Sequence, residues 1–221
     1  IPQAKPHLFD VATKQEVPVS DELFPNPWLN GPRIEWALDS SQCYYVYNQR
    51  VHRVLRVASI DAKTGTVRKV VSEEPQTFVD YAYKKYLHFL HDKHELIWMS
   101  ERDGWNHLYL LDSQSGQVKH QITQGQWVVR SVKHVDVEKR QVWFTASGKN
   151  PGQDPYYIHN YRVNFDGTQL IQLHLVYFFV VVPFALALGV SLLRLLVCLS
   201  KLFSEQALSL VWFLLFLGVL G

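Results

Sequence analysis

The feature that most constrains this fold is a series of short segments rich in β-branched and aromatic residues, separated by turn residues. From Ile34 onward, strands are predicted near 34–38, 42–48, 53–60, 66–71, 86–90, 94–99, 107–112, 117–122, 127–135, 141–146 and 156–165. These segments have the usual length of strands, and none of them shows the pattern of a helix. The sequence therefore predicts an all-β domain.

Turns within this region recur at a regular interval. In the segments Asp61–Gly65 and Asp112–Gly116, the Asp can accept hydrogen bonds from the backbone ahead of it and the Gly can supply a positive φ. Asp112 follows Asp61 by 51 residues, and Asp166 follows Asp112 by 54. A period of about 45–55 residues with four strands per unit is typical of propeller blades. We predict a partial β-propeller of about three four-stranded antiparallel blades.

Tryptophans support the same repeat. Trp98 and Trp143 begin similar phrases 45 residues apart, and Trp36 begins an earlier one. We predict that these three side chains occupy equivalent inner positions, where each packs against a neighbouring blade.

Composition divides the chain into three parts. Residues 1–32 are proline-rich and lack periodicity, so we expect an extended segment that connects or decorates rather than forming a core. Residues 33–168 are the predicted partial propeller. Residues 1–168 together hold 20 Lys/Arg and 19 Asp/Glu, whereas residues 169–221 hold three charges and 17 leucines. We expect residues 169–221 to lie outside the propeller and to form an apolar helical tail.

The tail has two interpretations. Leu175 to Leu193 is a run of 19 uncharged residues, long enough to span a bilayer as a helix. Arg194 and Lys201 follow it, before a second apolar run from Gln206 to Gly221; the positive-inside rule then places residues 1–168 on the extracellular or periplasmic side. The alternatives are a secreted protein and a tail that arises from a misread frame or a retained intron. Because the chain begins at Ile1 and Met99 is its one methionine, we expect a processed or truncated product.

Composition also excludes several functions. The balanced charge and the lack of a basic run argue against nucleic-acid binding. The two cysteines, Cys43 and Cys198, lie in different regions, so neither a disulfide framework nor a cysteine zinc site is expected. We find no Gly-x-Ser-x-Gly elbow, glycine-rich phosphate loop or His-Glu-x-x-His motif, and we expect no cofactor and no catalytic residue in this chain.

Several side chains have both a structural and a functional interpretation. His88, His91 and His94 could bind a metal, but their spacing in a strand and turn favours a structural role. Glu73-Glu74 could bind an amine, but its place at a strand end before Pro75 favours a solvated turn.

A second group lies in a turn and on the strands. Arg102, Asp103 and Asn106 flank Gly104, and we interpret them as residues that order the blade edge, although loops on one propeller face often bind ligands. The strand tryptophans and tyrosines are interpreted as blade core, with a sugar or peptide platform as the alternative.

Four phrases in order resemble the N-terminal propeller of dipeptidyl peptidase IV-type enzymes, in the prolyl oligopeptidase family of serine peptidases. They are Tyr47-Asn-Gln-Arg50 followed by His52, Trp98-Met-Ser-Glu-Arg-Asp-Gly-Trp-Asn-His-Leu-Tyr-Leu-Leu-Asp112, Gln121-Ile-Thr-Gln-Gly-Gln-Trp-Val-Val-Arg-Ser131, and Asn150-Pro-Gly-Gln-Asp-Pro-Tyr-Tyr157 through Tyr161-Arg-Val-Asn-Phe-Asp-Gly167. Val51 stands where that family more usually has Gly. The resemblance covers about residues 23–168.

The resemblance implies an eight-bladed propeller followed by an α/β-hydrolase domain whose Ser-Asp-His triad releases N-terminal dipeptides with proline or alanine second. Its glutamate pair, which holds the substrate ammonium, has a helical, aromatic setting that Glu73-Glu74 lacks, so this role is not transferred. The expected partners are peptide substrates through the hydrolase domain, a second copy in a homodimer, and a membrane through residues 175–193. A membrane-tethered propeller that acts as an interaction module is the alternative function.

Overall fold

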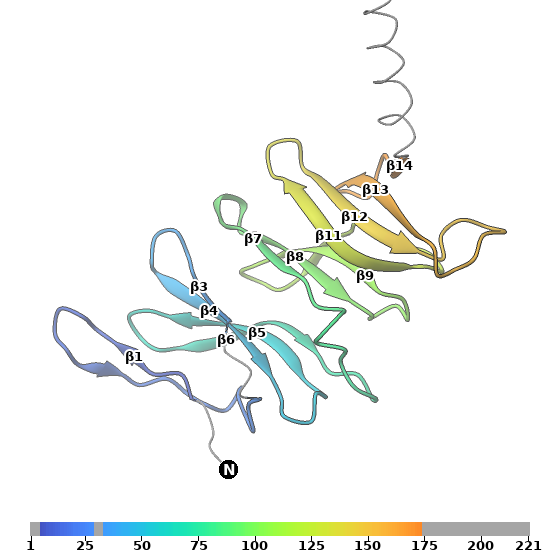
Figure 1. Cartoon of the computed structure of the whole chain (residues 1–221). Helices are drawn as coiled ribbons and strands as arrows, with labels where there is room; N and C mark the ends of the chain where they lie inside the picture. Colours follow the sequence, from blue (N-terminus) through green and yellow to red (C-terminus); the bar gives the residue numbers. More distant parts are fainter. Residues whose placement is uncertain (1–4, 29–32, 174–221) are drawn as a thin grey trace, which may run out of the picture. The chain divides into compact units, whose positions relative to one another are not determined.

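The computed structural model describes residues 5–28 and 33–173, which belong to one compact unit that ends at Leu173. Three four-stranded antiparallel sheets follow one another along the chain (Figure 1). The first holds β3 (Arg33–Trp36), β4 (Gln42–Asn48), β5 (Leu55–Asp61) and β6 (Val67–Glu73). The second holds β7 (Leu87–Leu90), β8 (Glu95–Ser100), β9 (His107–Asp112) and β10 (Val118–Gln121). The third holds β11 (Val128–Asp136), β12 (Gln141–Ser147), β13 (Ile158–Asn164) and β14 (Ile171–Leu173).

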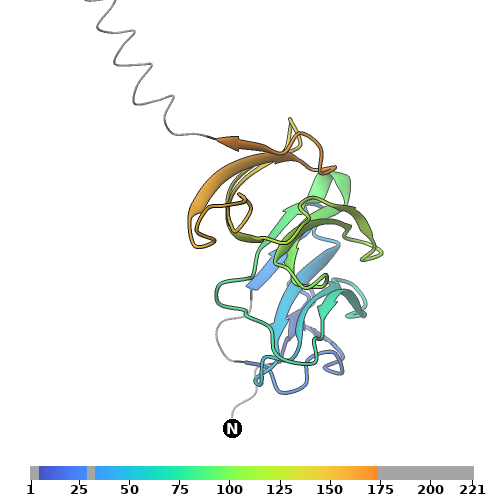
Figure 2. The ribbon, with the colours of Figure 1, turned by 90° about the vertical axis from the view of Figure 1, so that its right-hand side faces the viewer.

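The all-β prediction is confirmed, and each of the eleven predicted strands overlaps an observed one. Within the described residues, the one helix is the short 3₁₀ turn η1 (His91–Lys93) between β7 and β8. In every sheet the strands run in chain order from the first to the fourth, as in a meander. The colours of Figure 2 show that the three sheets also succeed one another in chain order. This arrangement is consistent with a partial propeller.

Neighbouring sheets pack face to face through alternating side chains. Leu96 and Trp98 on β8 join an apolar cluster with the first sheet, whereas Ile97 and Met99 on the same strand join a cluster with the third sheet. The period of two in a β-strand separates these two sets, so β8 is buried on both faces.

The structure corrects the predicted tryptophan repeat. The fourth residue of each second strand is aromatic and faces the preceding part of the chain: Tyr45, Trp98 and Phe144. Trp143 is one position earlier on β12 and therefore points to the opposite face, while Trp36 lies on the first strand β3. Sequence similarity between short phrases did not fix the strand register, and a shift of one residue reverses the face.

A fourth copy of the repeated hairpin is present in the N-terminal segment. The strands β1 (Leu8–Phe9) and β2 (Glu16–Val17) pair around a turn in which the Lys14 amide donates to the Asp10 carbonyl at 2.8 Å. The Gly65 amide donates to the Asp61 carbonyl at 3.0 Å in the same pattern. Lys14 and Gly65 are 51 residues apart and both have a positive φ, of 58° and 68°. The expectation of a purely extended segment over residues 1–32 is therefore wrong for this hairpin.

The hairpin also belongs to a core, contrary to expectation. Leu8, Val19, Leu23 and the buried Phe24 pack against the first sheet. Gly65 lies so close to this segment that a Cβ atom there would be 2.0 Å from the carbonyl oxygen of Pro18. Prolines do not prevent this packing because the hairpin itself, residues 8–17, contains none.

The third sheet corrects the predicted boundary at residue 168. Ile171–Leu173 is its fourth strand, β14, and pairs with Asn160–Arg162 of β13. The turn before it begins at Asn164, whose amide donates to the Thr168 carbonyl, so Asn164 and not Asp166 is the equivalent of Asp61 and Asp112. The apolar composition that begins after Thr168 conceals this strand because β14 has only three residues.

The predicted tail falls outside the description from residue 174 onward, and so do the runs 175–193 and 206–221. Among residues 5–28 and 33–173, no helix is long and apolar enough to cross a bilayer.

Candidate functional site

The two edges of the sheets differ in their connections. The loop edge carries loops 49–54, 74–86, 101–106, 122–127 and 148–157, which connect second strands to third strands and one sheet to the next. The hairpin edge carries the short turns 37–41, 62–66, 91–94, 113–117, 137–140 and 165–170. Because loops on one edge of a scaffold commonly carry function, a functional site is expected on the loop edge.

A cavity of about 480 Å³ opens on the loop edge between the first and second sheets. Buried Leu55, Val79 and Met99 supply part of the apolar lining of the cavity, and charged side chains of both signs also line it. The full lining is Leu55, Glu73, Glu74, Pro75, Thr77, Phe78, Val79, Lys84, Met99, Ser100, Glu101 and Arg102. The cavity is large enough for a short peptide segment or a small molecule.

Glu73 joins the two sheets at this cavity. Its Oε1 accepts hydrogen bonds from Trp98 Nε1 at 2.9 Å and from Arg102 Nη2 at 2.7 Å. The Arg102 guanidinium also lies over the Tyr109 ring, 4.8 Å from its centroid. The Glu73 side chain is 16% exposed, so this ion pair is better shielded from water than a surface pair.

Glu74 is held within the first sheet. Its Oε1 accepts hydrogen bonds from Ser72 Oγ at 2.5 Å and from Arg56 Nη2 at 2.9 Å. These bonds, from Ser72 first and then Arg56, hold the pKa of the Glu74 carboxyl below its usual range. Arg56 is buried and also donates to the Leu23 carbonyl, so it links the N-terminal segment to this cavity.

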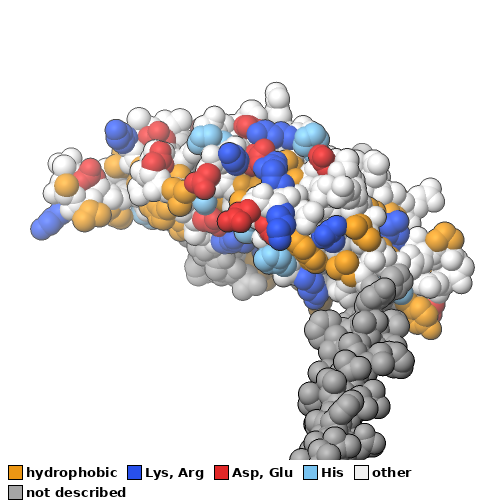
Figure 3. Space-filling model, turned by 90° about the horizontal axis from the view of Figure 1, so that it is seen from above, with side chains coloured by type: hydrophobic (Ala, Val, Ile, Leu, Met, Phe, Trp, Pro, Cys, Tyr) orange, Lys and Arg blue, Asp and Glu red, His pale blue; other side chains and the backbone are white. Residues whose placement is uncertain are grey.

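The structure corrects the interpretation of Glu73-Glu74 as a solvated turn for Glu73, which is 16% exposed and paired with Arg102. Glu74 is half exposed, as expected of a solvated position, and is paired with Arg56. The two glutamates therefore do not form a shared acceptor. Lys84 and Glu101 add a third ion pair of 2.6 Å in the cavity lining. Acidic and basic side chains are interspersed in the same way over the face shown in Figure 3.

Arg102, Asp103 and Asn106 order the loop edge, in agreement with their structural interpretation. The Asp103 carboxylate accepts from the Trp105 amide at 3.1 Å and from Gln121 Nε2 at 2.6 Å. Asn106 is buried and donates through Nδ2 to the Val129 carbonyl at 2.6 Å, which connects the second sheet to the third. These contacts explain how the three side chains order the loop edge, although the buried Oδ1 of Asn106 has no hydrogen-bond partner.

The three histidines that could bind a metal have separate partners. His88 is stacked near Tyr86, and His91 lies 3.1 Å from a Glu35 carboxylate oxygen and is stacked on Phe89. His94 ends η1 in a left-handed conformation. In the described part of the chain, no three His, Cys, Asp or Glu side chains come together in a group that could hold a metal ion.

Aromatic residues divide between core and surface. The strand residues Tyr44, Trp98 and Tyr109 are buried. Most of the exposed ones lie in loops of the loop edge, namely Phe78, Tyr83, Trp105, Tyr156 and Tyr157. The loop edge therefore offers aromatic contact surface that strand patterns could not reveal.

His107 and Glu95 are two structurally important residues that the sequence patterns do not indicate. His107 is fully buried; its Nδ1 lies 3.0 Å from Thr123 Oγ1 and its Nε2 lies 2.9 Å from the Gly125 carbonyl oxygen. These contacts hold the loop 122–127 against the second sheet. Because His107 and Thr123 are buried, they are inaccessible to a substrate. His107 lies within the Trp98–Asp112 phrase that carries the family resemblance, but nothing in that phrase indicates that its side chain is buried.

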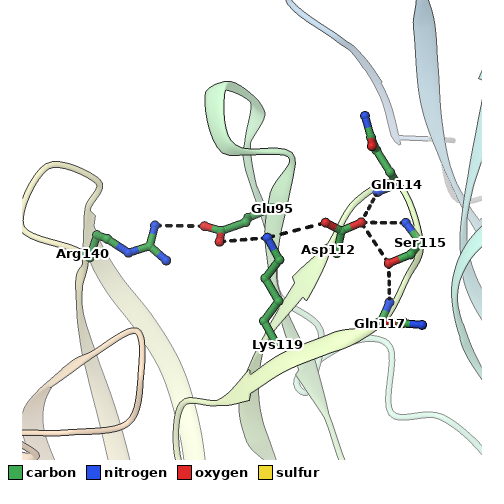
Figure 4. A network of polar contacts seen from close by, with 7 residues as sticks. All are labelled: Glu95, Asp112, Gln114, Ser115, Gln117, Lys119 and Arg140. Atoms are coloured by element: carbon green, nitrogen blue, oxygen red, sulfur yellow. Dashed lines mark hydrogen bonds and ion pairs between the residues drawn. The ribbon is translucent and has the colours of Figure 1, made fainter.

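Glu95 anchors a network on the hairpin edge (Figure 4). It accepts from Arg140 Nη1 of the third sheet at 2.9 Å and from Lys119 Nζ at 3.2 Å, and Lys119 also lies 3.5 Å from Asp112. Burial raises the pKa of Glu95, but the bonds from Arg140 and Lys119 outweigh burial and hold it below its usual range. Asp112 in turn accepts from the Ser115 amide at 2.7 Å and closes its own turn.

Comparison with known proteins gives a consistent match. The family model for the "Dipeptidyl peptidase IV (DPP IV) N-terminal region" matches residues 1–175. Dipeptidyl peptidase 4 of Trichophyton rubrum is 25% identical over 170 residues, and that of Trichophyton equinum is 26% identical over 170. Each alignment covers 75% of this chain and 21% of the relative, so the chain spans about a fifth of the length of these curated relatives.

A solved structure shows the same fold. The crystal structure of Porphyromonas gingivalis dipeptidyl peptidase 4 superposes with a TM-score of 0.63 at 21% identity. The superposition covers 76% of this chain and 23% of that one. The four-stranded sheets found here therefore have the fold of about a quarter of that longer chain.

Proposed function

Because the chain belongs to the family of dipeptidyl peptidase IV N-terminal regions, we propose that it is the propeller portion of a dipeptidyl peptidase IV-like serine exopeptidase. The match over residues 1–175 carries this proposal, and relatives named dipeptidyl peptidase 4 support it. The parent reaction is release of N-terminal dipeptides with proline or alanine in second place. In this proposal the chemistry belongs to a hydrolase domain and the sheets shape access to it.

The contacts of the loop edge support a shaping role. Acyl transfer needs an accessible nucleophile next to a base, and the His107–Thr123 pair is buried. The ion pairs of Glu73 and Glu74 hold the ends of the strands in place around the cavity. A rigid edge of this kind orients a substrate and does not act on it.

The test uses the purified chain and a chromogenic Gly-Pro anilide. We expect no turnover above buffer, and a homologous full-length peptidase serves as the positive control. Turnover that a serine-directed inhibitor abolishes, in material free of contaminating peptidase, would show that the chain is catalytic. Sequencing the transcript beyond the Leu173 codon in all three frames tests the parent activity, because a Gly-x-Ser-x-Gly elbow with later Asp and His residues is expected there.

The uncharged run from Leu175 to Leu193 supports a second proposal, a membrane-tethered propeller that acts as an interaction module. The test compares the full chain with a chain truncated after Leu173, which keeps β14 in the third sheet. Carbonate-resistant membrane association that is lost on truncation supports the tether. A transcript that never encodes the leucine-rich run would exclude it.

A further inference from the structure

Another, smaller pocket lies between the first and second sheets, at the loop-edge ends of their first strands β3 and β7. Its volume is about 120 Å³, and its lining is Arg33, Val46, Lys85, Tyr86, Leu87 and Trp98. Arg33 begins β3 and is opposite Val46 on β4, while Leu87 begins β7 and is opposite Trp98 on β8. Both sheets have all four strands here, so paired strands form the walls of the pocket.

The charged side chains that line this pocket are both basic. Lys85 is exposed and forms no ion pair with another described residue. Arg33 donates from Nη2 to Glu35 at 3.0 Å and from Nη1 to the Leu87 carbonyl at 3.3 Å, and a guanidinium has further N–H donors beyond these two. Burial raises the pKa of Tyr86 and the Arg33 guanidinium opposes that rise, so Arg33 lies close to the residue next to Lys85.

The remainder of the pocket is apolar and held in place by the sheets. Leu87 and Trp98 are buried, and Val46 is partly buried against the same apolar cluster. The Trp98 ring is fixed because its Nε1 donates to Glu73 at 2.9 Å. Among the described residues no carboxylate lines this pocket, whereas three glutamates line the larger cavity. The pocket therefore offers positive charge beside an apolar surface.

This combination selects a carboxylate on a short, unbranched apolar stem. The carboxylate can accept charge-assisted hydrogen bonds from Arg33 and lie near the Lys85 ammonium, while the stem contacts Leu87 and Trp98. A glutamate side chain has this shape and suits a volume of about 120 Å³. A peptide C-terminus fits less well, because the Cα atom next to its carboxylate carries both a side chain and the main chain, which need more room.

We propose that this pocket binds the side chain of a glutamate in a peptide, with the carboxylate held by Arg33 and Lys85 and the stem packed on Leu87 and Trp98. The site goes beyond the proposed peptidase role, because release of an N-terminal dipeptide requires no carboxylate on the peptide. Binding at this pocket also requires no hydrolase domain. A failure of the binding test is therefore distinct from a failure of the proposed function.

The test measures binding of short peptides to the full chain by NMR. The probe is acetyl-Gly-Glu-Gly amide, and acetyl-Gly-Gln-Gly amide is a neutral control of the same shape. We expect saturable shifts of the Leu87 amide and the Trp98 indole N–H with the Glu peptide. Because the two cations are partly exposed, the Gln peptide should bind about fivefold more weakly. Butyrate, which has the carboxylate and stem of glutamate, should compete with the Glu peptide.

Variants of the chain locate the site. Lys85→Glu should weaken binding of the Glu peptide about tenfold, and it leaves the fold intact because Lys85 is exposed and forms no ion pair with another described residue. Lys63→Glu makes the same charge change in the exposed turn 62–66 on the hairpin edge and should leave binding unchanged. Arg33→Gln should also weaken binding, and urea unfolding establishes that this variant folds without its bonds to Glu35 and Leu87.

Several outcomes would overturn the proposal. Equal binding of the Glu and Gln peptides would show that the two cations do not recognise the carboxylate. Equal effects of the variants at Lys85 and Lys63 would assign binding to the net charge of the chain and not to the pocket. Competition by acetate as strong as that by butyrate would show that the stem is not bound. Tighter binding of acetyl-Gly-Gly-Val with a free carboxylate would assign the pocket to a peptide C-terminus instead.

Discussion

The hairpin edge and the loop edge belong to the same sheets but are held by different kinds of contact. A turn of the hairpin edge is closed within its own sequence, as when Asp61 accepts from the Thr64 amide at 2.8 Å. The loop edge is held by residues far apart in the chain, such as Arg102 and Glu73, which are 29 positions apart. The local turns recur in successive sheets along the chain. The distant ion pairs determine how the loops are arranged around the cavity.

The largest effect is expected where the hairpin edge meets the preceding sheet. A Cβ atom on Gly116 would lie 2.1 Å from the Val70 carbonyl oxygen, and Gly116 has a φ of 76°. Backbone strain and overpacking together should make Gly116→Ala cost about 3 kcal/mol of unfolding free energy, measured by urea denaturation.

Gly104 on the loop edge is the matched control. Its φ is 91°, but a Cβ atom there would meet nothing within 4 Å. Gly104→Ala should therefore cost only the backbone strain, about 1–2 kcal/mol. Equal losses in the two variants would show that close packing of the hairpin edge adds nothing to stability.

The second prediction tests the distant contacts of the loop edge. Arg102→Ala removes the hydrogen bonds to Glu73 and Ser100 and the contact with the Tyr109 ring. Because the Glu73 side chain is largely buried, the unfolding free energy should fall by about 2 kcal/mol. Arg102→Lys should recover only part of it, since lysine lacks the planar guanidinium.

Lys84→Ala is the control for Arg102. The Lys84–Glu101 pair has side chains that are 34% and 41% exposed, so water screens it. Its loss should lower the unfolding free energy by less than about 1 kcal/mol. If the variants at Arg102 and Lys84 lose the same unfolding free energy, the shielded pair of Glu73 and Arg102 does not stabilise the loop edge more than an exposed pair does.

The third prediction concerns the distant contact on the hairpin edge. Glu95→Gln keeps the shape of the side chain but removes the charge that Lys119 and Arg140 share. Because both cations are more than a third exposed, they can be rehydrated, and the loss should be about 1 kcal/mol. The difference from the parent chain should shrink in 1 M NaCl, whereas Glu138→Gln in the exposed turn 137–140 should show no such dependence.

A loss above that of Arg102→Ala would reverse the comparison. It would mean that the ion pairs of Glu95 contribute more to the stability of the hairpin edge than a distant ion pair contributes to that of the loop edge.

The sequence predicted the hairpin edge well because its information is local. The turns at Asp61 and Asp112 lie where expected, and β4 has its predicted bounds of 42–48. The hairpin at Asp10 escaped prediction because Lys14 occupies the left-handed position that Gly65 occupies in the next copy. Without a glycine at this position, the turn cannot be recognised from the sequence, although its hydrogen bonds are the same.

The loop edge could not be predicted to the same extent. The pairing of Glu73 with Arg102 depends on how two sheets pack, and no interval in the sequence encodes that packing. The face of Trp143 depends on strand register, which phrase similarity misplaced by one residue.

The smallest effect is expected in the acid titration of the turns on the hairpin edge. The Thr64 amide first, and its hydroxyl second, hold the pKa of the Asp61 carboxyl below its usual range, and the Ser115 amide does the same for Asp112. A carboxyl with a lowered pKa in the folded state stabilises the turn above its unfolded pKa of about 3.9. This stability is lost as the pH falls below that value through the folded pKa.

The amide chemical shifts of Thr64 and Ser115 report this titration directly by NMR. Both should titrate with midpoints below about 3.9, because each amide donates to the carboxylate that is being protonated. Asp61→Asn keeps an acceptor at the first turn but removes its charge, so the Thr64 shift should become independent of pH while the Ser115 shift still titrates. A Thr64 midpoint above 4 would mean that the carboxylate does not hold the turn. The local closure that separates the hairpin edge from the loop edge would then rest on the backbone bonds from Gly65 to Asp61 and from Asp61 to Thr66.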